Sequence, residues 1–295
     1  MRVPSSRTAV LRAQLRRGAL TVPSCYDALG FRMLARAGFP AAFLSGFSVS
    51  ATRLGVPDAG LLSYGEMLAQ ARDVAASAPM PLIVDADTGF GNAQNVQRSA
   101  RGFADAGAAC LMLEDQESPK RDFGAPGAVV ARDEALRRVK AAVRAREAGA
   151  DILIIGRTDA RNAAGAASGM KEALWRANAF ADLGADILFV TGPHDRKELE
   201  RIRAATKLPL IVQVDEPGRA PLTPADVHKL GFTIALYGVT LVFAAAGAFR
   251  DAITHMKAGR PLPPERAVTP AEMAEIVGVP AYLQVDKDLK KRQRP

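Results

Sequence analysis

The chain alternates between segments with helical spacing and short, continuous apolar segments. In five places a helical segment ends in a small residue and a glycine, and an apolar stretch begins within two or three residues. A helix commonly ends in the left-handed conformation, which favours glycine, and stretches rich in Val, Ile, Leu and Phe are typical of parallel strands buried on both faces. The five stretches are AGFPAAFLSG (37–46), AGAACLMLED (106–115), AGADILIIGRTD (148–159), LGADILFVTG (183–192) and LGFTIALYG (230–238). Their glycines are Gly38, Gly107, Gly149, Gly184 and Gly231.

Three further apolar stretches complete the pattern: ALTVPSC (19–25), PLIVDADT (81–88) and LPLIVQV (208–214). Helical spacing is clearest in 133–148 and 170–183, which lack Gly and Pro. Eight strands that alternate with helices predict an α/β fold, a (β/α)8 TIM-type barrel. A doubly wound open sheet is the alternative, because periodicity alone does not show that the sheet closes.

The chain continues beyond the eighth strand. We expect a helix over about 239–258, a Pro-rich link (GRPLPPERAV) and another helix over 269–278. Thr269 is placed to cap that helix, with Pro270 in its first turn and Glu272 completing a capping box. We therefore predict a barrel with an N-terminal helix over residues 1–258 and a linker with a helical extension over 259–295, which packs on a neighbour in the same chain or in another subunit.

Composition narrows the class of protein. The formal net charge is +8, but Arg and Lys are scattered along helical stretches, aromatic residues are few and no nucleic-acid motif occurs, so we expect no nucleic-acid partner and instead an anionic small substrate. No apolar segment approaches the ~20 residues of a membrane span. An amphipathic opening helix explains the Arg-rich start as well as a transit peptide does. Cys25 and Cys110 lack CxxC spacing, which favours a reduced compartment; we predict a cytoplasmic protein without membrane partners.

Acidic residues collect where the predicted strands end, although the chain as a whole is basic. Asp85 and Asp87 are two apart in an extended segment, so their side chains share a face, and Glu114 ends the next strand. Hard oxygen ligands without a Cys or His set favour Mg²⁺, or Mn²⁺, over zinc. A helix cap or a solvated loop is the structural alternative for the Asp pair. Arg157 ends an apolar strand and needs an anionic partner, either substrate or neighbouring acids.

Several segments together resemble the isocitrate lyase/phosphoenolpyruvate mutase superfamily, in the right order from about residue 11 to 285. They are YDALGFRMLARAGF, FLSGFSVS, LGVPDAGLLSYGE, DADTGFGNAQNV, LEDQESPKR, GRTDAR and PLTPADVHKLGF. The resemblance implies a Mg²⁺-dependent barrel that forms an enolate of pyruvate or a close relative, in a homotetramer whose last helix is exchanged between subunits.

The resemblance also implies roles for single residues. Asp87 is expected to bind the metal directly, with supporting acids acting through water. Backbone amides of one segment hold the substrate carboxylate, Arg157 binds the reacting acid, and Tyr26 faces the site. The supporting acids are Asp85, Glu114 and Asp58, and the amide-bearing residues are Ser45, Gly46 and Phe47.

Departures from the family pattern bear on the substrate. Carbon–carbon lyases of this family carry a lid motif K-[KR]-C-G-H whose Cys is the general acid; here PKRDFG keeps Lys120 but places Asp122 at the Cys position. Thr191 stands where the lyases have Glu and the mutases His, and Gln213 replaces an Asn. We expect cleavage of a C–C bond in a 2-oxo or 2-hydroxy di- or tricarboxylate, by decarboxylation of oxaloacetate-like acids or aldol-type cleavage of substituted malates, with Asp122, water or Tyr26 as the acid.

Two alternatives remain. A phosphonomutase or phosphonopyruvate hydrolase fits the lid in shape, but a carboxylate of Asp122 beside a phosphonate would cost ~1–4 kcal/mol at 4 Å. The second alternative is a paralogue that binds metal and ketoacid without turnover. It stays open because the lid cysteine, the general acid of the lyases, is missing.

Overall fold

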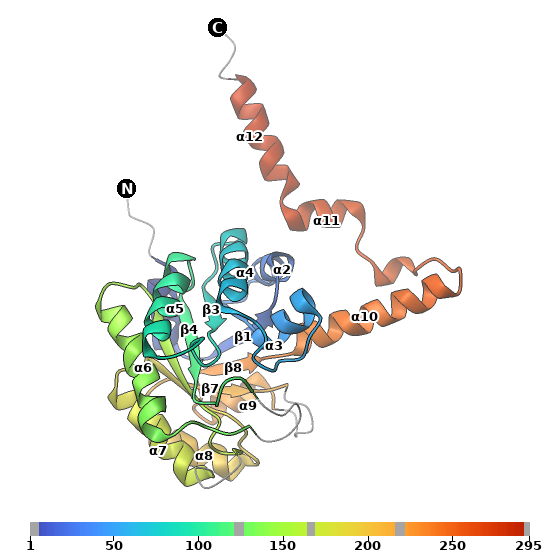
Figure 1. Cartoon of the computed structure of the whole chain (residues 1–295). Helices are drawn as coiled ribbons and strands as arrows, with labels where there is room; N and C mark the ends of the chain where they lie inside the picture. Colours follow the sequence, from blue (N-terminus) through green and yellow to red (C-terminus); the bar gives the residue numbers. More distant parts are fainter. Residues whose placement is uncertain (1–5, 121–126, 164–168, 216–221, 292–295) are drawn as a thin grey trace. The chain divides into compact units, whose positions relative to one another are not determined.

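The structure, a computed structural model, describes residues 6–120, 127–163, 169–215 and 222–291. Within these ranges eight parallel strands form a closed barrel in chain order (Figure 1). The first strand pairs with the last, with Leu20 opposite Ile234, so the (β/α)8 prediction is confirmed and the open sheet is wrong. The strands are β1 Leu20–Cys25, β2 Ala42–Leu44, β3 Leu82–Asp85, β4 Cys110–Glu114, β5 Leu153–Thr158, β6 Ile187–Val190, β7 Leu210–Gln213 and β8 Ile234–Tyr237.

Helices cover the outside of the barrel (Figure 1). The predicted glycines at the strand approaches have positive φ between 82° and 105°, as a left-handed helix end requires. The helices are α2 Ala28–Arg36, α4 Tyr64–Ser77, α5 Ala93–Asp105, α6 Arg132–Glu147, α7 Met170–Asp182, α8 Arg196–Ala205 and α9 Pro224–Lys229. A short helix α3 Gly46–Val49 and a π-helical turn Ser50–Leu54 follow β2.

Helix α1 (Arg7–Arg17) lies at the N-terminal end of the barrel. Its Leu11 is fully buried in the interior cluster, and Arg7 donates hydrogen bonds to the carbonyl oxygens of Gly107 and Ala75. These contacts join α1 to segments that precede β3 and β4. The predicted opening helix therefore belongs to the barrel.

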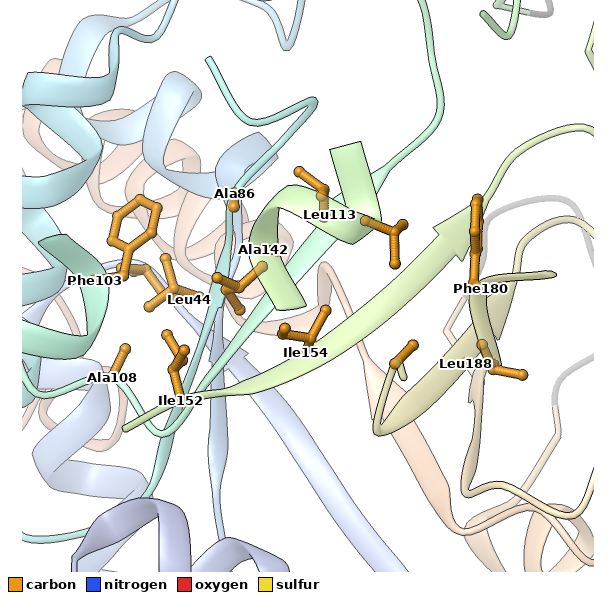
Figure 2. Packing of buried hydrophobic residues seen from close by; sticks show 14 of the residues in the cluster. Leu44, Ala86, Phe103, Ala108, Leu113, Ala142, Ile152, Ile154, Phe180 and Leu188 are labelled. Carbon is orange, nitrogen blue, oxygen red and sulfur yellow. The ribbon is translucent and has the colours of Figure 1, made fainter. Parts of the chain in front are cut away.

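Each strand divides its side chains between two hydrophobic clusters. In β4, Cys110 and Met112 belong to the cluster inside the barrel, whereas Leu111 and Leu113 belong to the cluster between barrel and helices. Figure 2 shows part of the outer cluster, with Leu44, Leu113, Ile154 and Leu188 from strands and Phe103, Ala142 and Phe180 from helices. Side chains alternate along a strand. The side chain two positions beyond the last interior apolar residue therefore also points into the barrel, and at the C-terminal strand ends these positions hold polar residues.

The described residues from 242 to 291 belong to a second compact unit. It contains most of α10 (Thr240–Lys257), a 3₁₀ turn (Pro264–Arg266), α11 (Pro270–Val277) and α12 (Val279–Lys291). The Thr269 hydroxyl accepts a hydrogen bond from the Glu272 amide, and Glu272 accepts one from the Thr269 amide, so the predicted capping box is present. The domain boundary at residue 258 stays a prediction. None of the helices in the described ranges is long and apolar enough to cross a membrane.

Candidate active site

The alternation of the strands places an ionic cluster at the C-terminal end of the barrel. Asp85 ends β3, Glu114 ends β4 and Arg157 is the last residue but one of β5, each two residues beyond an interior apolar side chain. Glu114 pairs in register with Arg157. A guanidinium nitrogen of Arg157 (Nη1) lies 3.0 Å from Oε2 of Glu114. The strand-end acids and Arg157 singled out in the sequence are therefore neighbours.

Glu114 has an environment unusual for a carboxylate. Only 1% of its side chain is exposed, and both carboxylate oxygens are buried without a hydrogen-bond donor among the described residues. Burial raises the pKa of Glu114 well above its ordinary value, against the opposing charges of Arg157 and Lys120. A buried carboxyl group is either paired with cations or neutralised by a proton, and the cations nearest Glu114 are Arg157 at 3.0 Å and Lys120 at 3.4 Å.

Lys120 lies among the acids. Its ammonium nitrogen is 3.1 Å from Asp58 Oδ2, 3.4 Å from Glu114 Oε1 and 3.8 Å from Asp87 Oδ1. Burial alone would lower the pKa of Lys120, but the three carboxylates outweigh it and raise the pKa, so Lys120 is protonated. The predicted acids Asp58, Asp87 and Glu114 thus surround one point, and a lysine ammonium occupies it.

Asp85 organises the backbone of the site. Its Oδ2 accepts a hydrogen bond from the Gly46 amide at 3.1 Å, and its Oδ1 accepts one from the Asp87 amide at 3.0 Å. A Cβ at position 46 would lie 2.9 Å from Oδ2, so the approach requires glycine. Burial raises the pKa of Asp85, while Lys120 lowers it. Asp85 therefore holds the segment before the acid cluster in place.

The segment after β2 begins at Ser45, which caps α3 by accepting a hydrogen bond from the Ser48 amide at 3.3 Å. Gly46 and Phe47 are the first residues of that short helix. Tyr26 follows β1 and packs, partly buried, against the outer hydrophobic cluster; burial and Asp27 raise its pKa. Asp27 caps α2 by accepting a hydrogen bond from the Gly30 amide at 2.7 Å.

A second carboxylate holds Arg157 from the other side. Asp159 accepts from Arg157 Nε at 2.8 Å and from Nη2 at 2.9 Å, and the Thr191 hydroxyl donates to Asp159 at 2.9 Å. Burial would raise the pKa of Asp159, but Arg157 outweighs it and lowers the pKa. The phenyl ring of Phe189 lies below, with its centroid 5.8 Å from the guanidinium carbon.

A cavity of about 210 Å³ opens beside Arg157. It is smaller than the ~300–1,000 Å³ of pockets for drug-sized ligands, which suits a small metabolite. Its lining includes the predicted Thr191 and Gln213. It also includes Gln116 and Asn162, which sequence reasoning missed although both follow strand-end motifs. The full lining is Gln116, Gly127, Arg157, Asp159, Asn162, Phe189, Thr191, Gly192, Pro193, Val212 and Gln213.

His194 lies one step outside this cavity. Its Nε2 is 2.9 Å from Asn162 Oδ1, and its Nδ1 is 3.0 Å from a guanidinium nitrogen of Arg161. The predicted general acid Asp122 lies outside the described residues, as does the rest of the PKRDFG segment after Lys120.

The donor set suits a hard divalent cation. Asp58, Asp85, Asp87 and Glu114 supply carboxylate oxygens, and among the described residues of this cluster there is no thiolate or imidazole. Among the described residues, no group of three or more His, Cys, Asp or Glu side chains is close enough to enclose a metal ion. Mg²⁺ does not need such an enclosure, because it usually keeps several waters and one or two direct carboxylates. The residues present therefore fit this kind of ion.

Comparison with known proteins identifies the family. A family model described as phosphoenolpyruvate phosphomutase matches residues 11–257. The 2,3-dimethylmalate lyase of Eubacterium barkeri is 38% identical over 240 residues, 81% of each chain. The oxaloacetate decarboxylase of Bradyrhizobium sp. strain ORS 278 is 33% identical over 295 residues, 96% of each chain.

Solved structures agree with this assignment. Oxaloacetate acetylhydrolase in complex with the inhibitor 3,3-difluorooxalacetate superposes with a TM-score of 0.90 at 30% identity, over 97% of both chains. Phosphonopyruvate hydrolase in complex with oxalate and Mg²⁺ superposes with a TM-score of 0.85 at 30% identity, over 96% of this chain and 99% of that one. The chain therefore belongs to the phosphoenolpyruvate phosphomutase family, in the isocitrate lyase/PEP mutase superfamily that its motifs resemble.

Proposed function

We propose that the protein is a divalent-metal-dependent lyase that cleaves a C–C bond in a small 2-oxo or 2-hydroxy carboxylate. The observation that carries the proposal is the convergence of Asp58, Asp87 and Glu114 on one point beside Arg157, with the oxygens of Glu114 buried and without hydrogen-bond donors in the described part of the chain. Relatives that include a dimethylmalate lyase and an oxaloacetate decarboxylase support a carbon–carbon lyase.

The metal is proposed as Mg²⁺, with Mn²⁺ as the alternative ion. Asp87 would hold it directly, and Asp58, Asp85 and Glu114 would act through water. When bound, such an ion supplies a Lewis acid that stabilises the negative oxygen of an enolate. The presence of oxalate and Mg²⁺ in the related phosphonopyruvate hydrolase supports this ion.

The substrate carboxylate is proposed to be bound by the chain's own residues. Arg157 would bind the carboxylate next to the reacting carbonyl, with amides of Ser45, Gly46 and Phe47 holding its other side. The contacts of Arg157 with Glu114 and Asp159 use three of its five N–H donors, so two remain for a substrate carboxylate. A fixed guanidinium next to the developing charge stabilises the transition state without reorganisation.

Proton transfer and substrate choice are assigned to other residues. Asp122 or Tyr26 would return a proton to the enolate, and Lys120 would offset negative charge near it. Thr191 and Gln213, at the wall of the cavity, would select the group that leaves. The cavity is lined there by neutral side chains, which suits a short acid better than a tricarboxylate with its additional charge.

The assembly is proposed as a homotetramer with exchanged C-terminal helices. The observation behind it is a set of large apolar side chains in residues 242–291 that are about half exposed or more. They are Phe249, Ile253, Met256, Tyr282, Leu283, Val285 and Leu289. Exposed apolar surface of this kind commonly marks a protein interface. Light scattering on the full chain, with Tyr282→Asp/Leu283→Asp as the disrupted variant, tests it; a monomer in both would sink the idea. A cytoplasmic location stays a prediction.

The decisive experiment is Mg²⁺-dependent release of pyruvate from oxaloacetate, 2-methylisocitrate, 2,3-dimethylmalate and phosphonopyruvate. Asp87→Ala and EDTA should abolish it, whereas Asp73→Ala on the exposed face of α4 should not. Turnover of phosphonopyruvate alone would favour a P–C enzyme. Binding of oxalate without turnover of any substrate would favour a non-catalytic paralogue.

A further inference from the structure

We propose that Lys120 is a built-in counter-ion of the acid cluster, whose ammonium occupies the metal position and must leave before a divalent cation binds. The inference rests on the proposed metal site. The Lys120 nitrogen lies within 3.1–3.8 Å of carboxylate oxygens from Asp58, Asp87 and Glu114. The Lys120 ammonium donates a hydrogen bond to Asp58 at 3.1 Å and forms ion pairs with Glu114 at 3.4 Å and Asp87 at 3.8 Å.

Burial makes the two occupants mutually exclusive. The side chain of Lys120 is 16% exposed and that of Glu114 is 1% exposed, so little water screens the charges. A divalent cation bound to the same oxygens would lie within a few ångströms of the ammonium, and like charges at that distance in a partly dry site repel strongly. The carboxylates can therefore hold the ammonium or the metal, but not both.

The backbone at Lys120 packs against Gly60, whereas its ammonium lies at the end of a long side chain. Gly60 packs against the preceding peptide: a Cβ at Gly60 would lie 3.2 Å from Pro119 Cα and 3.3 Å from the Lys120 amide nitrogen. The segment that carries Asp58 thus supports the backbone of Lys120 directly. The ammonium is on a flexible four-carbon stem, so rotation of that stem is enough to vacate the cluster.

The alternative is a permanent ion pair that stays in place when metal binds. The permanent ion pair and the competing ammonium predict different effects of losing Lys120 on the affinity for metal. A permanent pair would help to hold the acids in position, so loss of Lys120 would weaken metal binding or leave it unchanged. A competing ammonium would weaken metal binding in the native chain, so its loss would tighten metal binding.

Calorimetric titration with Mg²⁺ and Mn²⁺, without substrate, separates these outcomes. We expect Lys120→Met to bind either ion about ten-fold more tightly than the native chain, and Lys120→Arg, which keeps the charge, to bind near the native level. Lys140→Met, at an exposed position of α6, is the matched control and should not change affinity. Melting temperatures add an independent readout: without metal Lys120→Met should melt below the native chain, and saturating Mg²⁺ should reduce that difference.

A second measurement uses the native chain alone. Acylation by an N-hydroxysuccinimide ester, followed by peptide mass spectrometry, reports the accessibility of each lysine. Mg²⁺ should increase labelling of Lys120 and leave that of Lys140 unchanged. Equal or weaker metal binding by Lys120→Met, or labelling of Lys120 that does not rise with Mg²⁺, overturns the inference while the metal site stands. Absence of metal binding in every variant overturns both.

Discussion

Arg157 and Asp159 form a two-point ion pair across a single intervening residue, with Nε–Oδ2 at 2.8 Å and Nη2–Oδ1 at 2.9 Å. The remaining guanidinium nitrogen, Nη1, contacts Glu114 at 3.0 Å. This geometry fixes the plane of the guanidinium, because both ends of the fork are occupied. Asp159 is therefore a positioning residue for the group that would bind the substrate carboxylate.

We expect Asp159→Asn to weaken oxalate binding about ten-fold and to lower kcat/KM about 10- to 100-fold, because the guanidinium loses one side of its fork. Arg157→Lys should lose at least as much, since an ammonium cannot make the two-point contact. Thr191→Val removes one hydrogen bond to Asp159 and should cost only a few-fold. Calorimetry with oxalate and steady-state kinetics check the order; native values for Asp159→Asn would show that the pair plays no part in binding.

A buried arginine supports the same region from behind. The Arg176 side chain is 1% exposed; it lies 3.1 Å from Asp115 Oδ2 and 2.8 Å from Glu172 Oε1, and it donates to the Val130 carbonyl at 2.8 Å. Asp115 in turn accepts from the Asp159 amide at 2.9 Å. Arg176 thus stabilises the carboxylate that holds the turn after β5.

We expect Arg176→Met to lower the free energy of unfolding by about 3–5 kcal/mol, because Asp115 is left buried without its cation. The double variant Asp115→Asn/Arg176→Met should recover part of this loss, since no charge is then stranded. Arg196→Met, in an exposed pair with Glu200, is the control and should change stability by less than about 0.5 kcal/mol. Urea unfolding measures all three, and a loss as small as the control's would contradict the argument.

The strands were predictable because each is a short apolar run and five of them follow a helix-ending glycine, and these signals are local. Closure of the barrel was predicted from the count of eight alternating units and not from a local signal, since β1 meets β8 across more than two hundred residues and an open sheet has the same periodicity. Helix α12 was not predicted, because Gly278 ends the preceding helix and Pro280 lies only two residues further on. Proline is tolerated in the first turn of a helix, so the chain interrupts its helical structure at Gly278 and begins α12 at Val279.

The site was predictable in its residue types and less so in its contacts. Alternation along β3 to β5 indicated which acids share the rim with Arg157, whereas the place of Lys120 depends on residues 58–60 approaching residues 119–120 in space. Asp85 was expected to support a metal, and its oxygens are engaged by the amides of Gly46 and Asp87. Such contacts depend on tertiary packing, which no local pattern encodes.

Glu198 gives a pH-dependent contribution to stability. It accepts from Arg161 Nη2 at 2.6 Å and from Nε at 2.9 Å, and also from the His194 amide at 2.8 Å. The hydrogen bonds from Arg161 are the main reason that the pKa of Glu198 falls from 4.5 to about 2. A carboxyl group whose pKa is lower in the folded state stabilises that state fully at pH values above its unfolded-state pKa. This stabilisation is lost as the pH falls toward the folded-state pKa.

We therefore expect Glu198→Gln to destabilise the protein by about 1 kcal/mol at pH 7, with a difference from the native chain that shrinks as the pH falls from about 4.5 toward 2. Glu200→Gln, in the exposed pair with Arg196, should show little difference at any pH. Denaturant unfolding at pH 7, 5, 4 and 3 is the measurement. A difference that stays constant with pH would mean that the charge of Glu198 is not the stabilising feature.

Gly89 lies in the turn that follows Asp85 and Asp87. Its φ is +93°, and a Cβ there would lie 2.3 Å from Val96 Cγ2 and 3.1 Å from Leu113 Cδ1. Both obstacles belong to packed elements, the first turn of α5 and the strand residue before Glu114. A methyl group at Gly89 must therefore strain the turn and displace one of these neighbours.

We expect Gly89→Ala to lower the free energy of unfolding by about 2–4 kcal/mol and to weaken Mg²⁺ binding, because the displaced Leu113 adjoins Glu114. Gly65→Ala, in α4 with open space around it, should be neutral or stabilise by up to about 1 kcal/mol. Adding Val96→Ala removes the nearest obstacle, so Gly89→Ala/Val96→Ala should lose less stability than the two single changes sum to. If the double variant loses the full sum, the cost comes from the positive φ alone and the steric contact with α5 contributes nothing.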